Sequence, residues 1–516
     1  MRSIGCFLGI LLLAAGNHAF AGFSVTATPD ELIFNFDQKN AGRRVVELAP
    51  FQDPSNAVSQ ASLPADFRRT VVSVPRFDDG RDRIYSGFVA LDSGVAEGPM
   101  RFVEIRKNIS RHCDAYPRIK SKKGLQVQWV EDAVALGVQH AAFNIDIGMS
   151  VNMTPGPDDF TWQMDGRTFS FGRGYIEAMD RSIKTMSDQG ATVTLILLNY
   201  SHPGTEAGAI LQHPGYDTNC PGHISEFNTG TAEGLAWFKA WVEFLTDRYA
   251  ATGFPHGRVV NYIVGNEVNA HWDWANMGYV SMEQFARDYE RAVRICAMAA
   301  KKSSANDRVF ISLEHDWNTL YAESTNRQGF PGHLFLDYFN QSIKAGGNFD
   351  WNLAYHPYPE DLFNCRTWED KSAKPDENTP RITFKNIEVL TRYFQKKELL
   401  FRGSPRHIIL SEQGFHAKPT PEGEKEQAAA YCYAWRKIVN LKGIDAFILH
   451  RHVDNAGEGG LNLGLWRRAP DSTPGPPVKR PMYEVFRLAD TPQWKQAFEF
   501  ALPVIGIKSW QELDSK

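Results

Sequence analysis

Short, almost wholly apolar segments recur along the chain between residues 140 and 449, and polar side chains follow each of them. Seven are clear, at residues 140–145, 192–199, 262–267, 308–313, 351–355, 407–410 and 446–449. Runs of this length with little polar alternation are typical of strands buried on both faces, as in parallel sheets. We expect an eighth strand near residues 102–105, where a similar short run occurs.

Helical patterns lie between these runs. Apolar residues recur at helical spacing in segments 126–137, 175–186 and 235–249, and Gly190 follows the second of these at a typical helix end. Ser281 and Gln284 form a capping box at the start of a further helix. Repeated strand–helix units of this number predict the α/β class and a (β/α)8 TIM barrel, with an open doubly wound sheet as the structural alternative.

The chain before the barrel has a different pattern. Segments 31–36, 69–74 and 84–91 are short and rich in β-branched and aromatic residues, with Pro, Asp and Gly between them. We therefore expect a small β-rich domain at 22–97, a catalytic barrel at 98–490 and a C-terminal tail at 491–516 that packs on the barrel.

Residues 1–21 have the composition of a signal peptide. Arg2 precedes an apolar stretch at 7–15, and Ala19-Phe20-Ala21 provides a small-x-small cleavage site. The apolar stretch is too short to span a bilayer as a helix. The sequence thus predicts a secreted or periplasmic protein without a membrane span.

Composition and motifs narrow the class of function. A net charge of −4 gives no basic field for nucleic acid. No glycine-rich phosphate loop, HExxH or cysteine cluster is present, so we expect no cofactor and no metal. Cys220 and Cys365 lie in loop-like sequence and could pair in an oxidising compartment or remain free thiols. The sequence carries no signal for an oligomeric state.

Two of the apolar runs end on a glutamate, at Glu267 and Glu412. A carboxylate at the tip of a buried strand is costly to place there unless it has a role, and in a barrel this rim is where catalytic side chains collect. Two facing carboxylates could serve as the acid/base and nucleophile of a retaining glycosidase.

Three motifs resemble the large clan of retaining glycoside hydrolases with a (β/α)8 barrel. Gly265-Asn266-Glu267 resembles its motif at the end of strand 4, and Leu410-Ser411-Glu412 resembles the glutamate that ends strand 7. Tyr355-His356-Pro357-Tyr358 is similar to its strand-6 element. The resemblance implies a hydrolase that acts on a poly- or oligosaccharide by double displacement.

In that mechanism Glu412 is the nucleophile and Glu267 the acid/base. We expect Asn266 to bind the sugar 2-hydroxyl, and Tyr358 or His356 to donate to Glu412. The other expected substrate-binding residues are rim groups and two aromatic platforms: Asn144, Asn199, His450, Trp272 and Trp317.

Other readings remain open at this stage. Glu314 also ends a strand and could replace Glu412 or bind a hydroxyl group. Histidines near strand ends could instead hold the ion of a metal-dependent barrel hydrolase: His271, His315, His356, His416, His450 and His452. A third alternative is a non-catalytic carbohydrate-binding barrel.

Overall fold

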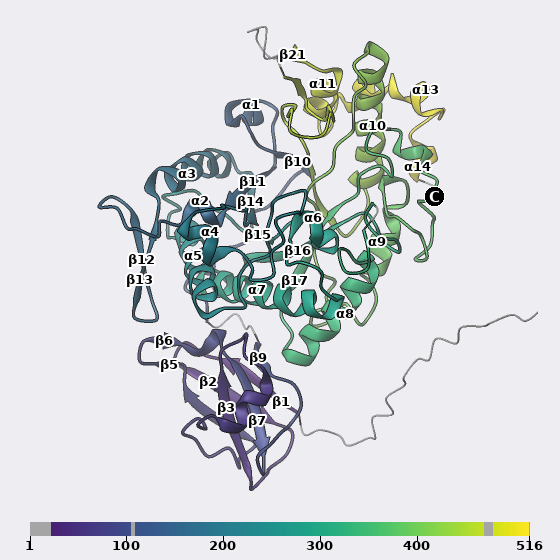
Figure 1. The fold of residues 1–516 in the computed structure, drawn as a ribbon. Coiled ribbons are helices and arrows are strands. Elements are labelled where there is room, and N and C mark those ends of the chain that lie inside the picture. The colour runs from purple at the N-terminus through teal and green to yellow at the C-terminus, as the bar shows by residue number, and fades with distance from the viewer. Residues whose placement is uncertain (1–21, 105–108, 323, 469–477, 515–516) are drawn as a thin grey trace, which may run out of the picture.

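A computed structural model describes residues 22–104, 109–322, 324–468 and 478–514. The predicted signal segment, 1–21, lies outside these residues. The chain forms an amino-terminal β-sheet unit and a larger barrel surrounded by helices (Figure 1).

The barrel is closed and parallel, which confirms the predicted fold class. Its eight strands follow chain order, and the last pairs with the first, Leu125 beside Leu449. The strands are β10 (Lys123–Gln126), β11 (His140–Asp146), β14 (Thr192–Leu198), β15 (Asn261–Val264), β16 (Arg308–Glu314), β17 (Trp351–His356), β18 (Ile408–Leu410) and β19 (Ile444–Leu449).

Two apolar layers explain why these strands read as continuous apolar runs. Inward-facing side chains fill the barrel interior: Ala142, Ile196, Leu198, Ile263, Phe310, Ala354, Ile409, Ala446 and Ile448. Outward-facing side chains pack against the helices, so both faces of each strand are buried.

The helices are of unequal length. The long ones are α3 (Arg173–Asp188), α5 (Ala232–Ala250), α7 (Met282–Ser303), α8 (Gly332–Gly346) and α10 (Pro421–Val439). The predicted capping box is present at the start of α7. Shorter ones are α1 (Val130–Ala135), α2 (Ile147–Ser150), α4 (Glu206–Leu211), α6 (His271–Trp274), α9 (Glu388–Tyr393), α11 (Pro481–Leu488), α12 (Trp494–Phe498), α13 (Ala501–Ile505) and α14 (Gln511–Asp514). Of the C-terminal helices, α11, α13 and α14 contact α10. Two small antiparallel two-stranded sheets lie in the same part of the chain: β12 (Phe160–Met164) with β13 (Arg167–Phe171), and β20 (Trp466–Arg467) with β21 (Val478–Lys479).

The amino-terminal unit is a seven-stranded sheet with one added hairpin. Its strands are β1 (Phe23–Ala27), β2 (Glu31–Phe36), β3 (Arg43–Leu48), β4 (Val71–Pro75), β7 (Gly87–Asp92), β8 (Val95–Ala96) and β9 (Arg101–Glu104), and β5 (Phe77–Asp78) pairs with β6 (Arg81–Asp82). Strand β9 pairs with β1 and β7. The expectation of an eighth barrel strand near 102–105 is therefore wrong, and the first barrel strand is β10.

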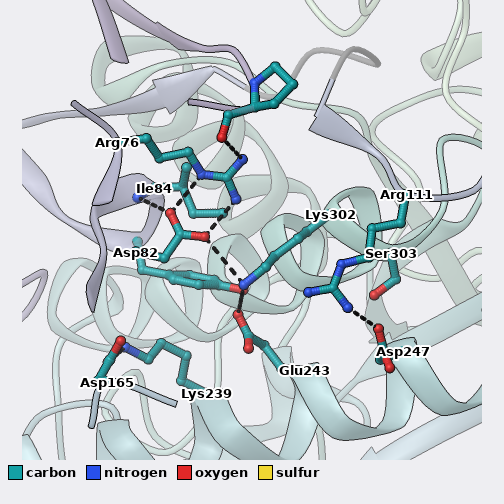
Figure 2. Close-up of polar contacts among 12 residues, drawn as sticks. Arg76, Asp82, Ile84, Arg111, Asp165, Lys239, Glu243, Asp247, Lys302 and Ser303 are labelled. Carbon is teal, nitrogen blue, oxygen red and sulfur yellow. Dashed lines mark hydrogen bonds and ion pairs between the residues drawn. The ribbon is translucent and has the colours of Figure 1, made fainter. Parts of the chain in front are cut away.

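A buried ion network joins the two units. Lys302 of α7 lies between Asp82 of the sheet unit and Glu243 of α5, at 3.3 and 2.6 Å from their carboxylate oxygens (Figure 2). Arg76 pairs with Asp82 at 2.6 Å, and Tyr85 Oη donates to Glu243 at 2.5 Å. All five side chains are at most 15% exposed, so the network fixes the sheet unit against the helices.

The structure also bears on the expectations about the cysteines and about a membrane span. The five cysteines of the described residues are free thiols, so the option of a Cys220–Cys365 bridge is wrong. Among the described helices, none combines the length and apolar character needed to cross a membrane.

Candidate active site

A cavity of about 730 Å³ lies at the carboxyl ends of the barrel strands. Its size is typical of small-molecule sites. Side chains from or just beyond all eight barrel strands line it, among them Gln126, Asn144, Leu198, Asn266, Glu267, Glu314, Tyr358, Glu412 and His450. The polar residues that follow the strands thus line a concave site.

Glu267 and Glu412 face each other in this cavity. They follow the fourth and seventh barrel strands, β15 and β18. A carboxylate oxygen of one lies within 4.8 Å of a carboxylate oxygen of the other. Carboxyl groups about 5–5.5 Å apart are typical of retaining glycosidases, and those of inverting enzymes are about 6.5–9.5 Å apart.

Glu267 is held in an unusual backbone conformation. Its φ and ψ are 43° and 48°, in the left-handed region that residues other than glycine seldom occupy. Its N–H donates to Ser312 Oγ at 3.0 Å. His356 Nδ1 lies 2.7 Å from Glu267 Oε1, and His356 Nε2 lies 3.0 Å from Ser411 Oγ. Strained backbone of this kind is concentrated at functional sites.

The surroundings of Glu267 favour its protonated form. Burial raises the pKa of Glu267, and the nearby carboxylate of Glu412 acts in the same direction. The contact with His356 opposes them without cancelling the rise. A carboxyl group in this environment is suited to donate a proton.

The surroundings of Glu412 favour its ionised form. Burial alone would raise the pKa of Glu412, but the charges of His450 and His356 and two hydrogen bonds outweigh burial and lower it. Gln126 Nε2 donates to Oε2 at 2.9 Å, and Tyr358 Oη donates to Oε1 at 3.1 Å. Of the two donors expected for Glu412, Tyr358 makes the contact, whereas His356 contacts Glu267.

The cavity is rich in carboxyl groups. Six line it, against two guanidinium groups: Glu267, Glu314, Asp316, Glu360, Glu412 and Glu458, with Arg381 and Arg451. Both arginines pair with lining carboxylates, Arg381 with Asp316 and Arg451 with Glu458.

Glu314 lies at the base of this acidic group. It is buried, and it accepts hydrogen bonds from Asn269 Nδ2 and from the N–H of Asp316. Burial raises its pKa well above the ordinary value, and Asp316 and Glu267 add to the rise. This environment favours the neutral form of Glu314, in contrast to that of Glu412.

The other predicted substrate-binding residues divide into two groups. Asn144, Asn266 and His450 line the cavity. Asn199 does not, because it is buried and its Nδ2 donates to the carbonyl oxygens of Leu211 and Glu226.

The two predicted aromatic platforms need correction. Trp317 has no exposed surface and packs edge-on against Tyr393. Trp272 is buried against Tyr279. Trp274, two residues further along α6, is the tryptophan that lines the cavity.

Several lining residues were not predicted from the sequence. Gln126 ends a strand that the helical pattern at 126–137 concealed. Tyr321, Arg381 and Glu458 lie in long segments beyond the strand ends. The sequence 125–128, in which apolar residues alternate with glutamines, is the one signal that could have indicated β10 and Gln126.

A larger cavity, of about 1010 Å³, lies at the opposite ends of the strands. Both of its carboxylates are paired with cationic groups of the same lining: Asp445 with Arg308 and His407, and Asp490 with Lys123. The facing glutamates lie only at the carboxyl ends, so we place the candidate chemistry there.

The rim histidines do not converge on one point. His271 stacks on Phe330, His416 accepts from the N–H of Asn462, and His452 contacts Asp132. Among the described residues, two groups of three side chains could offer metal ligands at close range, and each contains a single histidine: Glu267 with His356 and Glu412, and Glu314 with His315 and Asp316.

Three known structures with a similar fold are described as a glycoside hydrolase or a β-glucosidase. A family 39 glycoside hydrolase from the gut symbiont Bacteroides cellulosilyticus WH2 is 12% identical over 91% of this chain and 79% of that chain, with a TM-score of 0.45. A family 1 β-glucosidase from Thermotoga maritima is 13% identical over 70% and 85%, with a TM-score of 0.44. A hyperthermophilic β-glucosidase from Pyrococcus furiosus is 14% identical over 73% and 86%, with a TM-score of 0.45. Similarity at this level concerns the fold and carries no inference about activity or substrate.

Comparison of the sequence gives one result. Residues 115–513 match a family described as a family of unknown function (DUF5722). The match covers the barrel and the C-terminal helices and begins after β9 of the sheet unit. No curated protein matches the chain.

Proposed function

The chain belongs to this family of unknown function (DUF5722), and from the geometry of its own site we propose that it is a glycoside hydrolase that acts with retention. The observation that carries the proposal is the pair Glu267 and Glu412, with carboxylate oxygens within 4.8 Å and surroundings that shift their pKa values in opposite directions. One acid kept protonated beside one kept ionised is what double displacement requires.

The proposed reaction has two steps. Glu412 attacks the anomeric carbon and forms a glycosyl–enzyme ester while the glycosidic C–O bond breaks, and Glu267 gives its proton to the leaving oxygen. Glu267, now a carboxylate, then takes a proton from water, whose oxygen attacks the anomeric carbon and releases Glu412. Asn266 lies on the same lining as Glu267 and is the group we assign to the sugar 2-hydroxyl.

The test uses proton NMR of the anomeric signals. The purified protein is incubated with 4-nitrophenyl glycosides and with plant, algal and microbial polysaccharides, beside Glu412→Gln and Glu377→Gln. Glu377 is an exposed residue paired with Lys396, so its variant is a matched control. We expect a first product with the configuration of the substrate, formed by wild type and by Glu377→Gln but not by Glu412→Gln.

Different results would point elsewhere. An inverted first product would refute retention, and full turnover by Glu412→Gln would refute the site. Binding of an oligosaccharide without any turnover would favour the carbohydrate-binding barrel. For the metal-dependent alternative, the discriminating result is loss of turnover in a chelator and its return with Zn²⁺; the separated histidines favour insensitivity to the chelator.

We also propose that the protein is exported, on the strength of the signal-like composition of residues 1–21. The measurement is the mass of the protein recovered from the periplasm or medium of an expressing bacterium. A mature N-terminus directly after Ala21 supports export, and an uncleaved cytoplasmic product contradicts it.

A further inference from the structure

A chain of hydrogen bonds leads from a segment above the cavity to the candidate nucleophile. Glu458 Oε1 lies 3.0 Å from His450 Nε2, and His450 Nδ1 lies 2.6 Å from Gln126 Oε1. Gln126 Nε2 completes the chain by donating to Glu412 Oε2 at 2.9 Å. Barrel closure makes this possible, because β10 and β19 pair and place Gln126 and His450 at adjacent strand ends.

The partners of Gln126 fix the orientation of its amide. Its Nε2 faces two oxygens that can only accept, Glu412 Oε2 and the carbonyl oxygen of Ser411. The amide oxygen must then face His450 Nδ1, and an amide oxygen can only accept. His450 Nδ1 therefore carries a proton.

The second ring nitrogen of His450 faces a carboxylate. The guanidinium group of Arg451 pairs with Glu458 Oε1, so this carboxylate is ionised and acts as an acceptor. His450 Nε2 must then donate to Glu458. With protons on both nitrogens, His450 is an imidazolium ion.

The positive ring lies among charges from several elements. The carboxyl groups of Glu267, Glu412 and Glu458 face it, and the guanidinium group of Arg451 pairs with the same Glu458 oxygen. One cationic ring thus stands between two carboxylates, Glu458 on one side and, through the Gln126 amide, Glu412 on the other.

We propose that Gln126, His450 and Glu458 are positioning residues that together hold Glu412 ionised and in one orientation. The consequence of this positioning for catalysis rests on the proposed function, but the charge of His450 and the ionisation of Glu412 can be measured without a substrate. The arrangement also gives His450, predicted as a substrate-binding residue, a second role beside the nucleophile.

The first measurement is ¹⁵N NMR of the full-length protein labelled in its histidines. The shifts of Nδ1 and Nε2 distinguish an imidazolium from either neutral tautomer, and the His450 signals are identified by their loss in His450→Gln. We expect protons on both nitrogens at about pH 7, and at least a tenfold fall in the ratio of protonated to neutral ring in Glu458→Gln. His452 contacts Asp132 instead, so its signals should not change. A neutral His450 at about pH 7 in the wild type overturns the proposal.

The second measurement is a ¹³C NMR titration of Glu412 in protein labelled at glutamate carboxyl carbons. We expect the titration to move to higher pH in Gln126→Met and in His450→Gln, two variants that break the same relay at different bonds. Gln427→Met is the matched control, since Gln427 is buried and donates to the carbonyl oxygen of Phe415 outside the cavity. Circular dichroism confirms that each variant is folded. An unchanged Glu412 titration in both relay variants overturns the proposal.

The two proposals can fail separately. Expected titrations in a protein that hydrolyses no glycoside support the relay and count against the glycosidase. Retaining hydrolysis with a neutral His450 supports the glycosidase and overturns the relay.

Discussion

Tyr358→Phe removes one oxygen atom and, with it, one of the two side-chain hydrogen bonds to Glu412. Tyr358 Oη donates to Glu412 Oε1 at 3.1 Å, while Gln126 serves the other carboxylate oxygen. A hydrogen bond to a charged group contributes about 1.5–3 kcal/mol. If that energy is lost from the reacting carboxylate, kcat/KM falls about 10- to 150-fold.

The same substitution should also shift the pH dependence of kcat/KM in a defined direction. The pKa of Glu412 is lowered partly by this hydrogen bond, and in the proposed reaction Glu412 must be ionised to attack. Its removal raises the pKa, so the acid limb of the kcat/KM profile moves to higher pH. The assay is initial hydrolysis of an accepted 4-nitrophenyl glycoside across the pH range.

Tyr355→Phe is the matched control for this change. Tyr355 lies on the same segment, is fully buried, and donates to the carbonyl oxygen of Ile382 at 3.3 Å, away from the glutamates. Its variant should keep the wild-type acid limb. If Tyr358→Phe keeps that limb as well, the assigned role of Tyr358 is refuted.

Two further predictions concern charge. Lys302→Met leaves Asp82 and Glu243 without their shared cation, and we expect a loss of about 3–5 kcal/mol in the free energy of unfolding by urea; a loss below about 1 kcal/mol, as for an exposed pair, would contradict it. Burial raises the pKa of Glu226 from 4.5 to about 8. Folding therefore takes up a proton between these values, and the wild-type Tm should fall as pH rises from about 5 to about 8. Other buried carboxyl groups with raised pKa values, such as Asp307, contribute to the same fall. Glu226→Gln should therefore show a smaller fall than the wild type, and equal slopes for the two proteins would disprove the assignment.

Local sequence could identify the strands whose side chains are apolar on both faces. The run 192–199 is almost wholly apolar and became β14, whereas β10 has four residues and begins with Lys123. Lys123 is buried only because its ammonium group reaches Asp490. That partner is hundreds of residues away, so the local pattern gave no reason to expect a buried lysine at the start of a barrel strand.

The mistaken eighth strand has a related cause. Segment 101–104 does form a strand, β9, but it lies parallel to β1 in the amino-terminal sheet. Propensity and alternation indicate that a segment is extended; they do not indicate which sheet receives it. The choice depends on long-range pairing.

The site could be predicted as far as strand order places side chains. Glu267 and Glu412 were found because strand ends collect at one rim. The choice between Trp272 and Trp274 was not accessible, because two positions on an α-helix differ by about 200° and only one of the two can face the cavity. Helix α6 has four residues, too few for a periodic pattern to give its orientation.

The backbone at Glu267 leads to one more prediction. Its φ of 43° costs a residue with a Cβ about 1–2 kcal/mol, whereas glycine adopts this conformation freely. Glu267→Ala and Glu267→Gly remove the same carboxyl group and the same contact with His356, so the difference between them isolates the backbone. We expect the glycine variant to be more stable than the alanine variant by about 1 kcal/mol in thermal unfolding, although alanine is normally the more stabilising of the two.

A more stable glycine variant would mean that Glu267 occupies a backbone conformation that is unfavourable for a residue with a Cβ, and that the surrounding structure holds its carboxyl group at the cavity. The Ser312 hydroxyl that accepts the Glu267 N–H holds the turn in place. Equal stability of the two variants, or a more stable alanine variant, would show that the turn is relaxed. In that case the left-handed conformation would cease to count as support for a working residue at position 267, and the carboxylate pair alone would carry the proposed function.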